Sequence, residues 1–153
     1  MRLSSPDGIV LELDITGYEF PSIHDDHWDS NWLIVRGRVA HPRGDWSFRQ
    51  PCLTTFEVGD LARWLEGVAN GAPEAKLGYF TEPNLEFEYA ALPDPVIEVR
   101  VAHECAPPWL EIGDARLDGV VLRFPLAIND PIESAAALRA ALEVYHVRGP
   151  GHD

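Results

Sequence analysis

The chain has 153 residues, of which 46% are hydrophobic and 24% are charged, and this composition excludes a disordered or fibrous protein. Its 25 acidic and 12 basic residues give a formal net charge of −13, which disfavours nucleic acid and anionic membranes as partners and favours a basic protein. The charge alone leaves open the alternative that the acidic surface serves solubility only.

The first two strands are predicted from the alternation of apolar and polar residues. The segment Ile9–Ile15 places apolar side chains on one face and Glu12 and Asp14 on the other, as in a half-buried strand. A second strand is predicted at Trp32–Ala40, where Gly37 indicates a bulge or the close approach of another segment.

The middle of the chain is predicted to change from strand to helix. After a turn, Trp46–Glu57 is expected to be strand divided by Pro51 and paired antiparallel with the preceding strand. Apolar residues then recur at the spacing of a helix, which predicts a helix near Gly59–Asn70. They are Leu61, Trp64, Leu65 and Val68.

The second half of the chain is predicted to hold four more strands. The first is a short strand at Leu77–Thr81, divided from the next by Glu82 and Pro83. The other three are expected at Asn84–Ala90, Pro95–His103 and Gly119–Ala127, where apolar and polar residues alternate again. Their alternation places acidic side chains on the outward face. These are Glu86, Glu88 and Glu98.

A second main helix is predicted at Pro131–His146, because Asp130 is a suitable cap and Pro131 is favoured at the first helical position. The order of elements predicts an α+β fold in which one antiparallel β-sheet meander has two main helices packed on it. No linker divides the chain, so we expect a single domain over residues 1–153.

The sequence contains no recognisable catalytic or cofactor motif. The run His24-Asp25-Asp26-His27 holds four potential metal ligands, but consecutive residues rarely converge on one ion, so we expect a solvated loop. Cys52 and Cys105 lack a CxxC partner and a catalytic signature, so both are expected to pack as small hydrophobic residues without a disulfide. We therefore expect no metal, no cofactor and no enzymatic activity.

The five tryptophans are assigned to two kinds of position. Trp32, Trp46 and Trp64 are expected in the core, whereas Trp28 and Trp109 lie in polar or proline-rich loops and are candidate anchors of a protein interface. A stacking platform for nucleic acid is disfavoured, because such sites interleave aromatic residues with Arg and Lys.

Several short segments carry a resemblance to a known family. They are Gly17-Tyr-Glu-Phe-Pro21, Asp29 with Trp32-Leu-Ile-Val35, Pro51–Glu57 followed by Leu61 and Trp64-Leu65, and Phe80–Phe87. In these segments the chain resembles the WapI-type immunity proteins of bacterial polymorphic toxin systems. The stretch Glu82-Pro83-Asn84-Leu85-x-Phe87 is the most specific part, and the resemblance extends more loosely to the carboxyl terminus.

The resemblance implies a protein that binds the toxic domain of a cognate effector and blocks it, and many such toxins are nucleases. A basic toxin domain fits the negative charge of the chain, and we expect neither nucleic acid nor a membrane as partner. We expect a cytoplasmic location, since the sequence shows neither a signal peptide nor a run of about 18 apolar residues. The alternatives are an accessory or structural interaction domain and an unrecognised enzyme.

The predicted partner-binding residues are the outward carboxylates and the two loop tryptophans. They are Glu12, Asp14, Glu86, Glu88, Glu98, Trp28 and Trp109. If the strands are neighbours, the carboxylates form one negative face that attracts a basic toxin. The alternative is that they are solvated charges on an open sheet, and the family motifs are expected to serve the fold.

Overall fold

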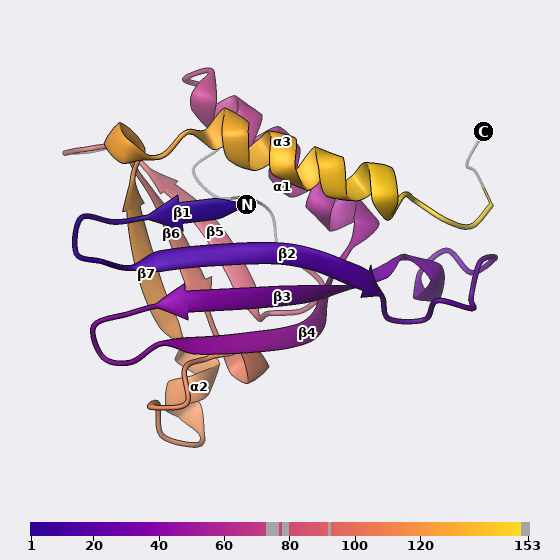
Figure 1. Cartoon of the computed structure of the whole chain (residues 1–153), viewed down its shortest axis with the longest axis horizontal. Helices are drawn as coiled ribbons and strands as arrows, with labels where there is room; N and C mark the ends of the chain where they lie inside the picture. Colours follow the sequence, from indigo (N-terminus) through magenta and orange to yellow (C-terminus); the bar gives the residue numbers. More distant parts are fainter. Residues whose placement is uncertain (73–76, 78–79, 92, 151–153) are drawn as a thin grey trace.

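The computed structural model of the protein describes residues 1–72, 77, 80–91 and 93–150, so part of the short strand predicted at Leu77–Thr81 lies outside the described residues. Its strands form two antiparallel sheets, each with its strands in sequence order. The four-stranded sheet contains β1 (Arg2–Ser4), β2 (Val10–Tyr18), β3 (Trp32–Ala40) and β4 (Trp46–Thr54). The three-stranded sheet contains β5 (Leu85–Ala90), β6 (Val96–Val101) and β7 (Val120–Pro125). The strands of the two sheets run in clearly different directions (Figure 1).

The prediction of an α+β fold is confirmed, but the prediction of one continuous sheet is wrong. Each sheet is an antiparallel meander, yet the first sheet ends with β4, because α1 (Thr55–Ala69) follows that strand directly. The chain therefore leaves the four-stranded sheet through a helix and begins a second layer at β5. Alternation along a strand specifies which face is buried, and it does not specify which sheet the strand joins.

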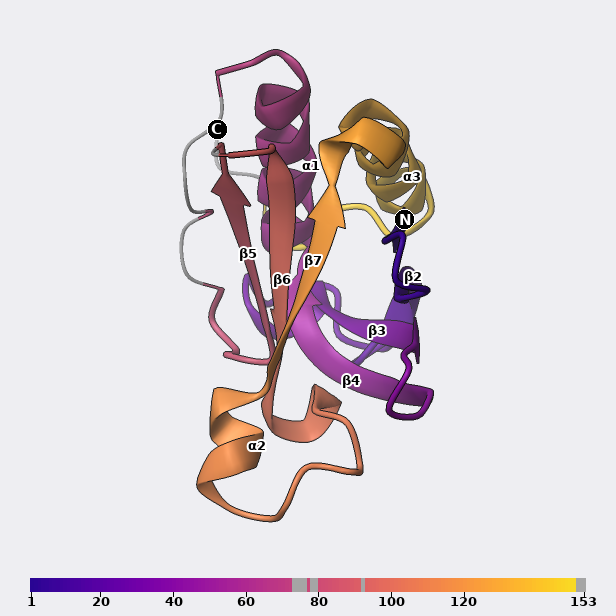
Figure 2. The same ribbon diagram turned by 90° about the vertical axis from the view of Figure 1, so that its left-hand side faces the viewer.

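The two long helices, α1 and α3 (Pro131–Val144), pack against each other (Figure 2). Arg139 of α3 donates two hydrogen bonds to the carboxylate of Glu66 on α1, at 2.5 and 2.8 Å. The shorter helices are η1 (Asp29–Asn31), η2 (His103–Cys105), α2 (Asp114–Asp118) and η3 (Leu126–Ile128). None of the helices in the described part of the chain is both long and apolar enough to cross a membrane.

The start of α1 differs from the prediction, because Thr55 begins the helix inside a segment expected to be strand. The Thr54 hydroxyl accepts a hydrogen bond from the Glu57 backbone N–H at 3.2 Å, and the Glu57 carboxylate accepts one from the Thr54 N–H at 2.8 Å. This reciprocal capping box satisfies two backbone donors at the helix start. The Thr-x-x-Glu spacing in the sequence is the signal for it.

Both sheets and both long helices contribute to one hydrophobic core. Fully buried side chains in it include Leu11, Leu33, Leu61, Phe87 and Ile97. The prediction that Trp46 and Trp64 are buried is confirmed, whereas Trp32 is only half-buried and was wrongly assigned to the core. Cys52 and Cys105 are buried as free thiols.

Gly37 illustrates how tightly the sheet faces pack. It lies opposite Phe48 in the pairing of β3 with β4, and a Cβ atom added at Gly37 would overlap the Phe48 ring. Phe48 is 7% exposed and part of the core. The close approach predicted from the sequence is therefore confirmed, and the missing side chain of Gly37 makes room for an aromatic ring.

We expect Gly37→Ala to lower the free energy of unfolding by about 1–3 kcal/mol, because the new methyl group displaces the buried Phe48 ring. Chemical denaturation of both proteins measures the difference. Gly17→Ala is the matched control, since Gly17 also lies in a strand and a Cβ atom there meets nothing within 4 Å. Equal losses of stability in the two variants would contradict this explanation.

Candidate functional site

The predicted acidic residues of β2 lie beside arginines of β3. Glu12 is 2.6 Å from the Arg38 guanidinium, and Asp14 is 3.0 Å from that of Arg36. Arg2 approaches Glu12 from β1 at 3.9 Å. The exposed side of the four-stranded sheet therefore carries ion pairs that offset the charge of both carboxylates.

The other three predicted carboxylates lie on the three-stranded sheet. Glu98 is 3.2 Å from Arg123, and Glu86 is 3.8 Å from Arg100. Glu88 pairs directly across the strands with Glu98. The condition for one negative face shared by these residues and those of β2, that their strands are neighbours, is not met, because β2 and β5 belong to different sheets.

The two predicted tryptophan anchors differ in exposure. Trp28 is 58% exposed and lies beside His27 and Phe56, with ring centroids 5.0 and 6.3 Å away. Trp109 is half-buried against the core and does not have the exposure expected of an anchor. Its indole N–H donates to the Gly44 carbonyl at 3.3 Å, and the Arg43 guanidinium covers its ring at 4.1 Å.

The run from His24 to His27 is a loop in which Asp26 has a structural role. Its carboxylate accepts hydrogen bonds from the backbone N–H groups of Trp28 and Asp29, at 2.8 and 2.6 Å. Such bonds are typical of Asp in a turn. Among the described residues, no group of three or more His, Cys, Asp or Glu side chains is placed to hold a metal ion.

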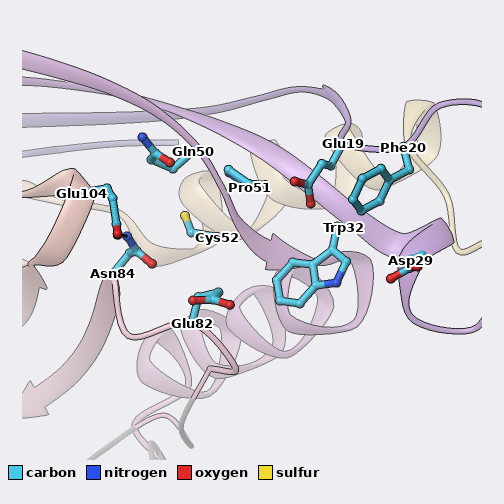
Figure 3. A pocket seen from close by; sticks show the side chains of 10 residues that line it. All are labelled: Glu19, Phe20, Asp29, Trp32, Gln50, Pro51, Cys52, Glu82, Asn84 and Glu104. Atoms are coloured by element: carbon cyan, nitrogen blue, oxygen red, sulfur yellow. Dashed lines mark hydrogen bonds between the residues drawn. The ribbon is translucent and has the colours of Figure 1, made fainter.

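A cleft of about 440 Å³ opens between the two sheets, beside the second half of β4. Ten described residues line it: Glu19, Phe20, Asp29, Trp32, Gln50, Pro51, Cys52, Glu82, Asn84 and Glu104. Four of them carry carboxylates, and these come from the loop after β2, from η1, from the turn before β5 and from η2. Figure 3 shows the Trp32 indole among the side chains of Glu19, Asp29 and Glu82.

The carboxylates of the cleft experience different surroundings. Partial burial and the charges of Asp29 and Glu82 raise the pKa of Glu19, because both effects disfavour its ionised form. The pKa of Glu104 is lowered by a hydrogen bond from its own backbone N–H and by one from the Asn84 amide, which lies 2.8 Å away. The negative charges of Asp29 and Glu82 therefore repel that of Glu19, while Glu104 is stabilised as a carboxylate.

The thiol in the cleft wall does not suit nucleophilic chemistry. A hydrogen bond with Cys105 and, to a smaller extent, burial raise the pKa of the Cys52 thiol, so the thiol stays protonated at neutral pH. A reactive cysteine requires the thiolate, which is favoured by nearby positive charge. The ten lining residues include neither His nor Lys nor Arg. The cleft thus has acidic and aromatic groups suited to binding a cation.

Asn31 holds the loop that carries Glu19, Phe20 and Asp29 of the cleft. Its side chain is fully buried, and its amide NH₂ donates to the carbonyls of His27 and Arg148, both at 2.8 Å. Its amide oxygen accepts from the Thr55 hydroxyl at 2.7 Å and from the Arg148 N–H at 2.9 Å. One side chain therefore joins the loop between β2 and β3, the start of α1 and the segment after α3.

The sequence analysis did not assign the cleft residues to a site. All of them except Gln50 and Glu104 belong to the segments that carry the family resemblance. Folding alone brings these residues together, because segments that lie apart in sequence between Gly17 and Phe87 meet at the cleft. The motifs expected to serve the fold therefore also present side chains to an open cleft.

Comparison with known proteins gives one match. The model of the family described as Immunity protein WapI-like family matches residues 2–146 of the chain. No curated protein and no solved structure matches it. The match extends well beyond the short segments that carry the family resemblance, and it includes every lining residue of the cleft.

We expect Asn31→Ala to lower the free energy of unfolding by about 1–3 kcal/mol, because it removes four hydrogen bonds and leaves the buried Thr55 hydroxyl without its partner. Thermal or chemical unfolding measures the loss. Asn70→Ala is the control, because Asn70 is exposed at the end of α1. The explanation is contradicted if both substitutions change the stability equally.

A second prediction concerns the pKa of Glu19, which burial and the negative charges of Asp29 and Glu82 raise. A raised carboxyl pKa means that the folded state holds a proton more tightly than the unfolded state, so this contribution to stability falls as pH rises above about 4.5 through the folded pKa. We expect Glu19→Gln to raise the melting temperature relative to the wild type at pH 7 more than at pH 4. Melting curves at both pH values test it, with Glu143→Gln on the exposed face of α3 as control. A gain that is the same at both pH values would exclude charge repulsion as its cause.

Proposed function

We propose that this chain, which belongs to the immunity protein WapI-like family, neutralises a cognate toxin domain by binding to it. The family match over residues 2–146 is the single observation that carries the proposal. The net charge of −13 supports a basic toxin as the partner, because opposite charge accelerates encounter and favours the complex. A nuclease is one class of toxin that fits this description, because the groove that binds nucleic acid is basic.

The proposal includes inhibition without catalysis. The described residues of the cleft offer neither a thiolate nor an imidazole, and their carboxylates lie on an open surface. General acid and base catalysis, by contrast, requires groups held against the substrate in a site that excludes water. The raised pKa of Glu19 is the observation that favours the alternative of an unrecognised enzyme, because such shifts are frequent in active sites. Here burial and two neighbouring carboxylates account for it.

The compartment and the contact surface are further parts of the proposal. Two buried free thiols are compatible with a reducing compartment, which supports action in the cytoplasm. The sheet carboxylates and Trp28 remain candidate contacts, although the ion pairs with arginine weaken the case for the sheets.

We expect co-expression of this chain to restore the growth of cells that produce the toxin domain encoded by the neighbouring reading frame. The purified chain should also bind that domain in a stable complex, measured by calorimetry. An acidic protein of similar size and charge serves as the control for non-specific attraction. Absence of both rescue and binding, with both proteins folded, would contradict the proposal.

The mass and activity of toxin recovered from the complex distinguish inhibition by binding from inhibition by catalysis. We expect toxin released from the complex by denaturant to have an unchanged mass and, after refolding, its full activity. Mass spectrometry and an activity assay measure these properties. A toxin that is cleaved or covalently modified would instead support the enzyme alternative.

A further inference from the structure

The carboxylates of this protein fall into two groups according to their partners. On the two sheets Glu12, Asp14, Glu86 and Glu98 lie within 4 Å of arginine side chains, as in the pairs Glu12–Arg38 and Glu98–Arg123. In the cleft, by contrast, the ten described lining residues include four carboxylates and no Lys or Arg. Within the described part of the chain, arginines therefore accompany these sheet carboxylates and none lines the cleft, where a cation from another molecule would offset the charge.

The arrangement of the cleft restricts the kind of cation that fits it. The described part of the chain holds no cluster of three or more acidic, His or Cys side chains placed around one ion, so the carboxylates are too dispersed for a metal. A cavity of about 440 Å³ lies within the range of about 300–1,000 Å³ that is usual for sites that bind organic groups. An extended organic cation with several hydrogen-bond donors fits this geometry better than a compact ion.

The aromatic wall of the cleft favours a guanidinium over an ammonium group. Trp32 and Phe20 both line the cavity, and planar guanidinium groups stack on aromatic rings while donating to carboxylates at their edges. The protein already shows this stacking, since the Arg148 guanidinium lies 3.4 Å from the centre of the Tyr18 ring and the Arg43 guanidinium covers Trp109.

The loop after β2, which contributes to the cleft, also carries exposed aromatic side chains. Phe20, which lines the cavity, is 37% exposed, and Trp28, next in the chain to the lining residue Asp29, is 58% exposed. Exposed aromatic side chains near a charged pocket are typical of a protein interface, where they exclude water from the polar contact. The occupant is therefore a side chain presented by a protein surface, with these aromatic side chains covered by the same partner.

We propose that the cleft receives an arginine side chain of the toxin, whose guanidinium stacks on Trp32 and donates hydrogen bonds to Glu19 and Glu82. The inference rests on the proposed function, because it takes the toxin as the partner. Burial of an arginine in this position offsets the repulsion among the cleft carboxylates. It also explains why residues from four separate segments present acidic groups to one cavity.

The test is the affinity of cleft variants for a catalytically inactive form of the toxin domain, measured by calorimetry. We expect Glu82→Gln to raise the Kd by about tenfold or more, because a charge-assisted hydrogen bond to the guanidinium is lost, and Asp29→Asn to raise it less, because only a neighbouring negative charge is removed. Both side chains are exposed and no described residue bonds to either carboxylate, so the variants should fold. Glu143→Gln on the exposed face of α3 is the matched control, with a change of less than about threefold expected, while Glu12→Gln and Glu98→Gln test the sheets as the alternative contact surface.

A reciprocal experiment identifies the arginine. Each exposed arginine of the toxin is replaced by glutamine, and the loss of affinity is measured with wild-type protein and with Glu82→Gln. We expect one toxin arginine whose replacement weakens binding to the wild type by about tenfold or more and binding to Glu82→Gln much less, the signature of direct coupling.

The outcomes separate the two proposals. If the wild type does not bind the toxin, the proposed function fails, and the arginine site fails with it. If the wild type binds tightly while the cleft variants bind equally well, or if only the sheet variants lose affinity, the proposed function stands and the arginine site is overturned. Coupling of the cleft to a toxin lysine and to no arginine would also overturn it.

Discussion

The four hydrogen bonds of the buried Asn31 amide are the interaction on which the cleft depends. They tie the loop after β2 to the start of α1 and to the segment after α3. Glu19, Asp29 and Trp32 all lie on or beside this loop, so their positions relative to β4 follow from it. Because the amide is fully buried, any movement of the loop leaves polar groups without partners, and this cost makes the loop rigid. A binding surface formed in advance loses less entropy when a partner arrives.

The carboxylates that are paired within the fold and those that are open to a partner lie in different parts of the molecule. Asp14 and Glu98 on the sheets have arginine partners, whereas in the cleft burial and repulsion by Asp29 and Glu82 raise the pKa of Glu19. Such repulsion lowers the stability of the free protein and is relieved when a cation enters, so it contributes to affinity. Sites of this kind are expected where function and stability conflict.

The two-layer architecture creates the cleft. A single continuous sheet would have placed β4 and β5 side by side, with their backbone hydrogen bonds paired and no space between them. Instead α1 follows β4, and the turn before β5 returns to face the end of that strand across the cavity. On the far side, η2 places Glu104 toward Asn84. The first residue of η2, His103, is the single described residue other than glycine with a positive φ, at 55°. Residues far apart in sequence are therefore joined in one wall.

The sequence by itself determined the class of fold, most strand positions, the second long helix and the close approach at Gly37, because these depend on local periodicity, caps and turn residues. It also indicated the family, since the resemblance lies in residue order. Only the tertiary structure decided that the strands divide into two sheets, that Glu12 and Glu98 have arginine partners, and that Trp32 lines a cleft while Trp109 is half-buried. These properties depend on which distant segments meet, and the alternation of residues along a strand is the same whichever neighbour it acquires.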